Sequence, residues 1–238
     1  IRAMKIISFR FQILLMGAFL LLLMGGSCTN SRKQNEDKQK QEPGIKTPVP
    51  EGWFSLFNGE SLESWEVTAF GTQGPVYVSE GNIVLGMGDG CTGITWKEDF
   101  PETNYEIYLE ASKRTGNDFF CGLTFPVGDT FCSLIVGGWG GPVVGLSTID
   151  DLDGSENETR TLKKFEHDKW YPVRLRVTPE KIEAWIDQEK LIDFNYLGHD
   201  ISIRPEVRLS RPLGICSWKT TAALRDIRWK AINSSGKE

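Results

Sequence analysis

Alternation of apolar and polar residues with a period of two is the feature of this sequence that most restricts its fold. In residues 105–110, 173–177, 182–186 and 227–231, every second side chain is apolar. A strand places successive side chains on opposite faces, so each segment is predicted to be a strand with one buried face. Gly, Asn, Asp and Pro punctuate these runs, and no long stretch has a helical apolar period. The sequence therefore predicts an all-β domain, either a sandwich, a jelly roll or a barrel.

The first 28 residues have the layout of an export signal. Three basic residues, Arg2, Lys5 and Arg10, precede an apolar run that ends at Met24, and small residues then lead to Cys28. A transmembrane helix needs about 20 apolar residues, and this run is shorter. A small residue directly before the cysteine resembles the bacterial lipoprotein signal, in which the cysteine becomes the lipidated first residue. We therefore predict lipidation of Cys28, with a plain secretory signal as the alternative.

The rest of the chain divides into a tether, a domain and a tail. Residues 29–50 are polar and poor in aromatics, so they cannot bury enough apolar surface to order themselves and are predicted to form a disordered tether. Residues 51–232 are predicted to form the β domain, and residues 233–238 a short tail. The expected location is the bacterial cell envelope, in the periplasm or at the cell surface, with a lipid anchor in the membrane.

Net charge argues against nucleic acid as a partner. The chain carries 27 basic and 32 acidic residues, for a formal net charge of −5. The first 28 residues hold three of the basic residues and no acidic one, so the remainder has 24 basic against 32 acidic residues, or −8. Because phosphate binding needs a basic face, no nucleic-acid partner is expected.

Four cysteines lie in the predicted domain: Cys91, Cys121, Cys132 and Cys216. An exported chain permits disulfides, and Cys121 and Cys132 flank a predicted hairpin turn. Buried free thiols explain the same residues equally well. No C-x-x-C spacing indicates a zinc site.

Several phrases of the domain resemble those of one known family. Residues 52–65 (GWFSLFNGESLESW) are similar to its LFNG-x-x-L-x-x-W opening, and residues 78–86 and 104–111 to its next hairpin and strand. Residues 169–187 resemble its paired central strands, and residues 213–228 its closing segment. On these motifs the chain resembles the 3-keto-disaccharide hydrolase family over nearly all of residues 51–232.

The resemblance implies a fold and a chemistry. It implies a concanavalin A-like lectin/glucanase jelly roll, a sandwich of two curved antiparallel sheets with a concave ligand face. It also implies cleavage of the glycosidic bond of 3-keto sugars. A ketone at C3 acidifies the proton on C2, so the leaving group can depart by elimination. Such a reaction needs a general base near C2 and a group that stabilises the developing oxyanion.

The chain departs from the family pattern at two places. Relatives carry N-S-G-h-h-x-R after the strand at 104–113, whereas residues 116–123 read GNDFFCGL, which keeps the Asn but lacks the Arg. Relatives carry an acid in the next strand, whereas residues 131–136 (FCSLIV) have none. These departures indicate that the active site of this chain has either moved or been lost relative to that of its relatives.

Most candidate site residues lie in the segment that follows the predicted strand and in the glycine-rich loop at 139–160, and three further tryptophans lie outside both. We predict Asp118, Glu156 and Asp150 as catalytic carboxylates, because acids in loops on a rigid scaffold can serve as general bases. Substrate contacts are predicted from amide, carboxylate and indole side chains: Asn117, Trp139, Asn157, Glu158, Trp96, Trp218 and Trp185. Trp139 is the first choice for stacking on a sugar, since flanking glycines let a ligand approach.

Other groups are assigned lesser roles. No cofactor and no metal are expected, although Asp150, Asp151 and Asp153 weakly resemble a calcium loop that lacks the full ligand spacing. His167 and His199 lie in polar, turn-like surroundings and are predicted to be surface residues.

Three functions are compatible with the sequence. The first is a carbohydrate-active enzyme that cleaves 3-keto or related glycosides, and the second is a non-catalytic carbohydrate-binding module on a lipid tether. The third is an interaction domain at the cell surface. The sequence leaves the choice between catalysis and binding open, while carbohydrate is the expected partner of the first two.

Overall fold

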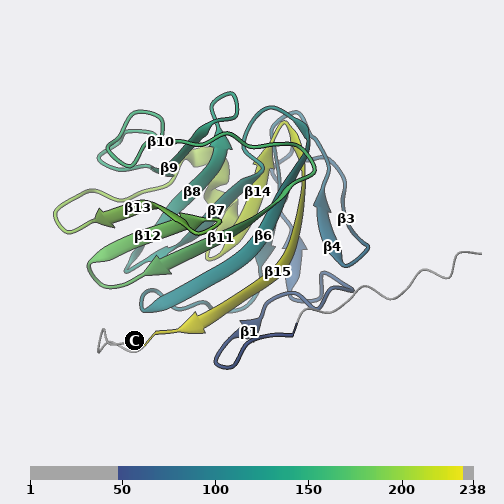
Figure 1. Ribbon diagram of the computed structural model, residues 1–238, viewed down its shortest axis with the longest axis horizontal. Helices are drawn as coiled ribbons and strands as arrows, with labels where there is room; N and C mark the ends of the chain where they lie inside the picture. The colour runs from purple at the N-terminus through teal and green to yellow at the C-terminus, as the bar shows by residue number, and fades with distance from the viewer. Residues whose placement is uncertain (1–47, 233–238) are drawn as a thin grey trace, which may run out of the picture. The chain divides into compact units, whose positions relative to one another are not determined.

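The computed structural model describes residues 48–232, and within them the strands form two antiparallel sheets. The predicted signal peptide, Cys28, most of the predicted tether and the tail lie outside the described residues. In Figure 1 the labels β13, β12, β11, β6 and β15 follow one another across one layer of the sandwich. The prediction of an all-β sandwich is confirmed.

The eight-stranded sheet has the order β13-β12-β11-β6-β15-β4-β3, and β1 also pairs with β15. Its strands are β1 (Phe54–Ser55), β3 (Val76–Ser79), β4 (Asn82–Leu85), β6 (Tyr105–Gly116), β11 (Trp170–Val177), β12 (Lys181–Ile186), β13 (Glu189–Asn195) and β15 (Thr220–Ala231).

The seven-stranded sheet has the order β10-β9-β8-β7-β14-β5-β2. Its strands are β2 (Trp65–Val67), β5 (Cys91–Trp96), β7 (Cys121–Val127), β8 (Thr130–Gly138), β9 (Val143–Ser147), β10 (Thr161–Leu162) and β14 (Gly214–Trp218). One short 3-10 helix, η1 (Pro205–Ser210), precedes β14. Within residues 48–232, no helix has the length and apolar character needed to cross a bilayer.

The core lies between the two sheets and is built from the alternating residues of the long strands. In β6, Tyr105, Ile107 and Leu109 are fully buried, and Leu123 and Leu134 meet them from β7 and β8 as part of one core cluster. Burial of such side chains stabilises the fold by about 1.5–3 kcal/mol each. The Tyr105 hydroxyl donates a hydrogen bond to the carbonyl of Pro126, which joins the two sheets at the strand ends.

The outer face of the eight-stranded sheet carries a network of charged and aromatic side chains. Glu106 is almost fully buried there, and its carboxylate oxygens lie 2.9 Å from Arg176 Nε and 3.5 Å from Arg174 Nη1. The guanidinium of Arg174 stacks 3.8 Å above the ring of Trp185. Buried carboxylates need such partners, because an unpaired one would cost several kcal/mol. This face is therefore covered by its own side chains.

Two connecting segments lie on the outer face of the seven-stranded sheet. The residues at 148–160 pack on β9 so closely that a Cβ at Gly145 would collide with the Gly154 carbonyl oxygen. The η1 helix packs on β14, where a Cβ at Gly214 would collide with the backbone of Ser210. Glycine at these two strand positions therefore lets both segments cover part of the sheet and bring their polar residues over it.

Candidate functional site

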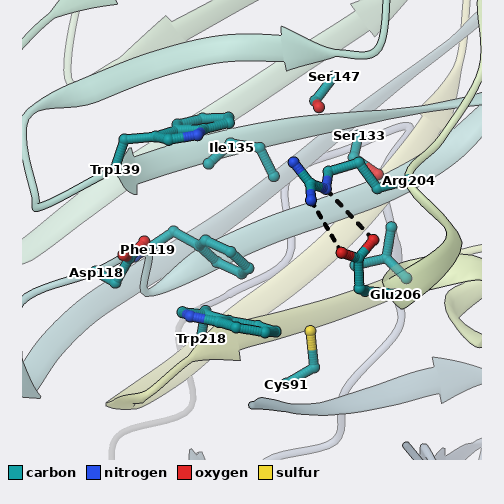
Figure 2. A pocket seen from close by; sticks show the side chains of 11 residues that line it. Cys91, Asp118, Phe119, Ser133, Ile135, Trp139, Ser147, Arg204, Glu206 and Trp218 are labelled. Atoms are coloured by element: carbon teal, nitrogen blue, oxygen red, sulfur yellow. Dashed lines mark hydrogen bonds and ion pairs between the residues drawn. The ribbon is translucent and has the colours of Figure 1, made fainter. Parts of the chain in front are cut away.

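A pocket of about 220 Å³ opens on the outer face of the seven-stranded sheet (Figure 2). Its walls come from β5, β8, β9 and β14, from the turns beside them, and from the segment at 204–207. The residues that line it are Cys91, Asp118, Phe119, Ser133, Ile135, Trp139, Ser147, Arg204, Glu206, Val207 and Trp218.

The pocket exists because two rows of mostly small residues cross this face of the sheet. Strand register sets the first row as Gly93, Cys216, Gly122, Ile135 and Gly145. It sets the second row as Thr95, Gly214, Thr124, Ser133 and Ser147. Residues that oppose one another across a ladder share a face, so these short side chains leave space above the sheet. The covering segments then close that space on one side.

One side of the pocket is aromatic. Figure 2 shows the indoles of Trp139 and Trp218 nearly edge-on, with Phe119 between them. Trp139 has a left-handed φ of 49° in the β8–β9 turn, and the residue is 37% exposed. The Trp218 amide donates to the Phe119 carbonyl at 3.0 Å, which ties the end of β14 to the segment before β7. Together these three rings offer apolar faces to a ligand.

The opposite side of the pocket holds an arginine between two carboxylates. Arg204 Nε and Nη2 donate to the two carboxylate oxygens of Glu206 at 3.3 and 2.9 Å, and Nη1 donates to Asp153 Oδ2 at 2.5 Å. The Ser147 hydroxyl donates to the other oxygen of Asp153 at 3.2 Å. The hydrogen bonds from Arg204 lower the pKa of Glu206, so this carboxylate is ionised at neutral pH.

Asp118 is the third acid of the site. Its Oδ1 accepts a hydrogen bond from the Phe119 amide at 2.8 Å, and its own amide donates to Thr220 Oγ1 at 3.1 Å. Figure 2 shows its carboxylate on the side of Phe119, away from Arg204 and Glu206. No cation pairs with Asp118 among residues 48–232. The carboxylate is therefore held in place by the backbone and is open to a ligand.

Cys91 and Val207, which line the pocket, form a small apolar cluster with the fully buried Cys216. A hydrogen bond with Cys91, together with burial, raises the pKa of the Cys216 thiol well above its usual value. Burial raises the pKa of Cys121 and of Cys132 to about 12. All four cysteines of the described residues are free and buried, which decides between the two alternatives left by the sequence in favour of free thiols.

Three of the sequence-predicted site residues line the pocket: Asp118, Trp139 and Trp218. The four loop residues Asp150, Glu156, Asn157 and Glu158 do not line it, and neither does Asn117. Asp150 accepts hydrogen bonds from His199 Nδ1 at 2.7 Å and from the Asp200 amide at 2.8 Å, and these contacts lower its pKa. Glu156 and Glu158 are exposed.

Asn157 has a local structural use. Its amide nitrogen donates to the carbonyls of Leu146 and Leu152 at 2.8 and 3.0 Å, and its oxygen accepts from the amide and hydroxyl of Thr159. The side chain is buried, so its hydrogen-bonding groups are turned to the loop and not to the pocket.

The two remaining tryptophans of the prediction also lie elsewhere. Trp96 packs edge-on against Trp65, with ring centroids 5.2 Å apart, at the other end of β5 from Cys91. Trp185 is 9% exposed and lies on the outer face of the eight-stranded sheet, between Arg174 and Lys190. Their environments differ from that of Trp139 because each is covered by neighbouring side chains.

The acidic turn at Asp150, Asp151 and Asp153 does not bring together a set of metal ligands in the described part of the chain. Asp150 faces His199 and Asp153 faces Arg204, and no group of three or more His, Cys, Asp or Glu side chains within residues 48–232 could hold a metal ion. The expectation that no metal or cofactor is needed stays a prediction.

Several residues that line the pocket were not predicted from the sequence: Cys91, Phe119, Ser133, Ile135, Ser147, Arg204, Glu206 and Val207. Asp153, which is bonded to Arg204, was considered only as part of a calcium loop. For Arg204 and Glu206 the chain offered one weak signal, a basic and an acidic residue around Pro205 in a segment without strand alternation. Ser133 and Ser147 could be recognised only from the strand register.

The two-layer antiparallel sandwich, with a pocket on one outer sheet face, places the chain in the class of jelly-roll domains. The sequence model of the 3-keto-alpha-glucoside-1,2-lyase-like domain matches residues 52–230. The chain belongs to this family, and the resemblance stated from its motifs is confirmed. Among curated proteins, none is a significant sequence match.

Solved structures share the fold at low sequence identity. A Crh5 transglycosylase in complex with NAG has a TM-score of 0.54 at 14% identity, covering 77% of this chain and 85% of that one. SCLam, an endo-beta-1,3(4)-glucanase from family GH16, has a TM-score of 0.51 at 10% identity, covering 80% and 94%. A glycosyl hydrolase candidate from Parabacteroides distasonis has a TM-score of 0.50 at 16% identity, covering 77% and 95%. The predicted concanavalin-like jelly roll is thereby confirmed.

Proposed function

We propose that the pocket binds a 3-keto glycoside and cleaves its glycosidic bond by elimination, with Asp118 as the general base. The observation that carries this proposal is that an acidic and a basic side chain lie on facing sides of one small pocket. An unpaired carboxylate lies on one side, and a guanidinium with unused N–H groups lies on the other. Family membership supplies the substrate class, since the matching domain is described as 3-keto-alpha-glucoside-1,2-lyase-like.

In the proposed reaction, Asp118 removes the proton from C2 of the sugar. The electron pair of that C–H bond forms an enolate with the C3 ketone, and the negative charge develops on the C3 oxygen. The enolate then collapses to restore the ketone, forms a C1–C2 double bond and breaks the C1–O bond. The leaving oxygen takes up the proton of the newly protonated Asp118, directly or relayed through a water molecule, which returns the base to its ionised state.

Arg204 is the proposed partner of the C3 oxygen. A guanidinium has five N–H donors, and three of them go to Glu206 and Asp153. The two remaining N–H groups can donate to an enolate oxygen, whose charge is greater than that of the ground-state ketone. Donors fixed in advance at such a position typically contribute about 100-fold or more to the rate.

Glu206 is a weaker candidate for the base. Its pKa is lowered by Arg204, and a carboxylate that holds its proton less strongly is a less effective base at neutral pH. Asp118 pairs with no cation in the part of the chain that the structure describes, so its carboxylate remains available, with Oδ1 already accepting from the Phe119 amide. The aromatic side of the pocket would hold the apolar face of the sugar ring through Trp139 and Trp218, as in other carbohydrate sites.

The second candidate function is carbohydrate binding without catalysis. The observation that favours it is the engagement of Arg204 by two carboxylates, which reduces its power to stabilise a developing oxyanion. The same pocket would then retain a sugar by stacking and hydrogen bonding alone. Export and anchoring through Cys28 belong to the proposal in both cases.

Turnover of a nitrophenyl 3-keto-glucoside by the purified chain tests the proposal through release of nitrophenolate. The unoxidised nitrophenyl glucoside should remain intact, because its C2 proton is not acidified. We expect Asp118→Asn to lower kcat/KM by about 100-fold or more and Arg204→Gln to lower it by about 100-fold. Binding of the keto sugar without release would favour the binding module.

Matched controls separate the pocket from the rest of the surface. Asp129 lies exposed in the turn between β7 and β8, and Asp129→Asn removes the same charge as Asp118→Asn. It should retain full turnover. Glu156→Gln tests the exposed loop acid predicted from the sequence. If Glu156→Gln abolishes release while Asp118→Asn keeps it, the base lies in the loop and the proposed assignment is wrong.

A further inference from the structure

The charges around Arg204 do not match those of an anion site. A receptor for a sugar carboxylate would present the guanidinium fork to the ligand with little competing negative charge. Here Nε and Nη2 of the guanidinium donate to Glu206, and Nη1 donates to Asp153. Both acids are on the chain itself, so the guanidinium is already neutralised before a ligand arrives.

We propose that Asp153 and Glu206 are specificity-determining residues that exclude sugars bearing a carboxylate from this pocket. The inference rests on the proposed function, because it assigns a substrate preference to the same site. Arg204 is the one cation among the described residues that line the pocket, whereas Asp118 and Glu206 both line it and Asp153 is bonded directly to that cation. The group as a whole is therefore negative.

The hydrogen-bond geometry explains why the arginine is still useful. Three of its five N–H donors are used, and the two that remain can donate to the hydroxyl or keto oxygens of an uncharged sugar. An anionic ligand would compete with Asp153 and Glu206 for the same guanidinium and would be repelled by Asp118. The arrangement makes Arg204 a hydrogen-bond donor to the sugar's own oxygens, including the C3 oxygen of the proposed reaction, and not a receptor for a sugar carboxylate.

Asp153 is held in this role by a second contact. Ser147, on β9, donates to its other oxygen at 3.2 Å, so the carboxylate is fixed between the sheet and Arg204. The side chain of Asp153 is 21% exposed, whereas those of Arg204 and Glu206 are 42% and 44% exposed. Because the group is in contact with water, its repulsion of an anion should weaken at high salt.

The experiment compares methyl glucoside with methyl glucuronide, which differ by a hydroxymethyl group and a carboxylate. Binding to the full chain is measured by titration calorimetry at low and high salt. We expect the glucoside to bind about fivefold more tightly at low salt, with a smaller ratio at high salt. In Asp153→Asn/Glu206→Gln, the guanidinium regains its free charge, and the ratio should fall to about one or reverse.

The control removes two negative charges elsewhere on the molecule. Glu102 and Asp129 are both exposed and do not line the pocket, so Glu102→Gln/Asp129→Asn should keep the preference of the unchanged chain. Should the pocket double variant fail to fold, Glu206→Gln alone is measured, with a smaller change in the same direction. Circular dichroism shows which variants are folded.

Two results would overturn the inference. One is a wild-type chain that binds the glucuronide as tightly as the glucoside or that binds neither sugar. The other is a folded pocket variant that retains the full preference. Failure of the proposed reaction looks different, because the chain would then bind the neutral sugar with the expected preference but release no nitrophenolate from the keto substrate.

Discussion

The tryptophans of this molecule differ in how far neighbouring side chains cover them. Trp139 projects from a turn and is 37% exposed at the pocket, whereas Trp96 packs on Trp65 and Trp185 is covered by Arg174. Alternation along a strand indicates which face a side chain occupies. It does not indicate what covers that face, which is why the sequence suggested all three as sugar contacts.

Replacing Trp139 should affect binding more than stability. We expect Trp139→Ala to weaken sugar binding by about tenfold, since a stacked ring is lost, and to change the free energy of unfolding by less than about 1 kcal/mol. Calorimetric titration and urea unfolding give the two quantities. Trp96→Ala is the matched control, with a loss of about 3 kcal/mol of stability and folded-state affinity unchanged. The reverse pattern would contradict the stacking role.

Asn157 shows a second limit at the residue scale. Its position among acids suggested a ligand contact, but both ends of its amide are used within the loop. An asparagine that organises a turn and one that contacts a ligand have the same local sequence context, since both favour polar, glycine-rich surroundings. Only the partners of the side chain distinguish them.

At the scale of elements, strands were predictable and the covering segments were not. The alternating runs at 105–110, 173–177, 182–186 and 227–231 lie in β6, β11, β12 and β15. By contrast, Asp153, Arg204 and Glu206 come from the loop at 148–160 and the η1 segment, which have no periodic pattern. Their approach to each other depends on pairing between distant strands, which a single sequence does not reveal.

The ion pair of Arg204 and Glu206 at the start of η1 should contribute to stability in a pH-dependent way. The pKa of Glu206 is lower in the folded chain than its ordinary value of 4.5, with the Arg204 hydrogen bonds as the main cause. A lowered pKa stabilises the fold above the unfolded value, and this contribution is lost as the pH falls through the folded value. Its size should stay below about 1 kcal/mol because the pair is partly exposed.

Urea unfolding of the wild type and of Arg204→Gln at several pH values tests this. The difference in unfolding free energy should be greatest near neutral pH and should shrink as the pH falls below 4.5. The reference is the same comparison made in the Glu206→Gln background. There, Arg204→Gln should change the unfolding free energy with little dependence on pH, because the carboxylate whose pKa Arg204 lowers is absent. A difference between the wild type and Arg204→Gln that grows on acidification would contradict the assignment.

At the scale of the whole molecule, the sandwich and its family follow from the motifs, while export remains a proposal. The alternating strands and the phrases at 52–65 and 213–228 were sufficient to predict the fold class and the family. The pocket itself could not be located, because the two rows of small residues are assembled from five strands whose register is not encoded locally. Asp118 and Trp139 were found through their neighbours in sequence.

The anchor prediction is tested on the full chain in a bacterial host. Wild-type protein should incorporate labelled palmitate and sediment with membranes, since Cys28 is the predicted lipidation site. Cys28→Ser should lose the label and leave the membrane fraction. Cys91→Ser is the control that also removes one thiol, and it should keep the label. Retention of label by Cys28→Ser would contradict the lipoprotein assignment.

The position of β15 has a consequence for how the chain reaches its final state. This strand ends at Ala231, yet it lies in the middle of its sheet, where it pairs with β1, β4 and β6. A ribosome or a secretion channel that releases the chain from its N-terminus therefore delivers the central strand last. Until then β4 and β6 lack their shared neighbour, so folding must await release of almost the entire domain. That delay would suit a polypeptide that must pass through a narrow translocation pore in an unfolded form.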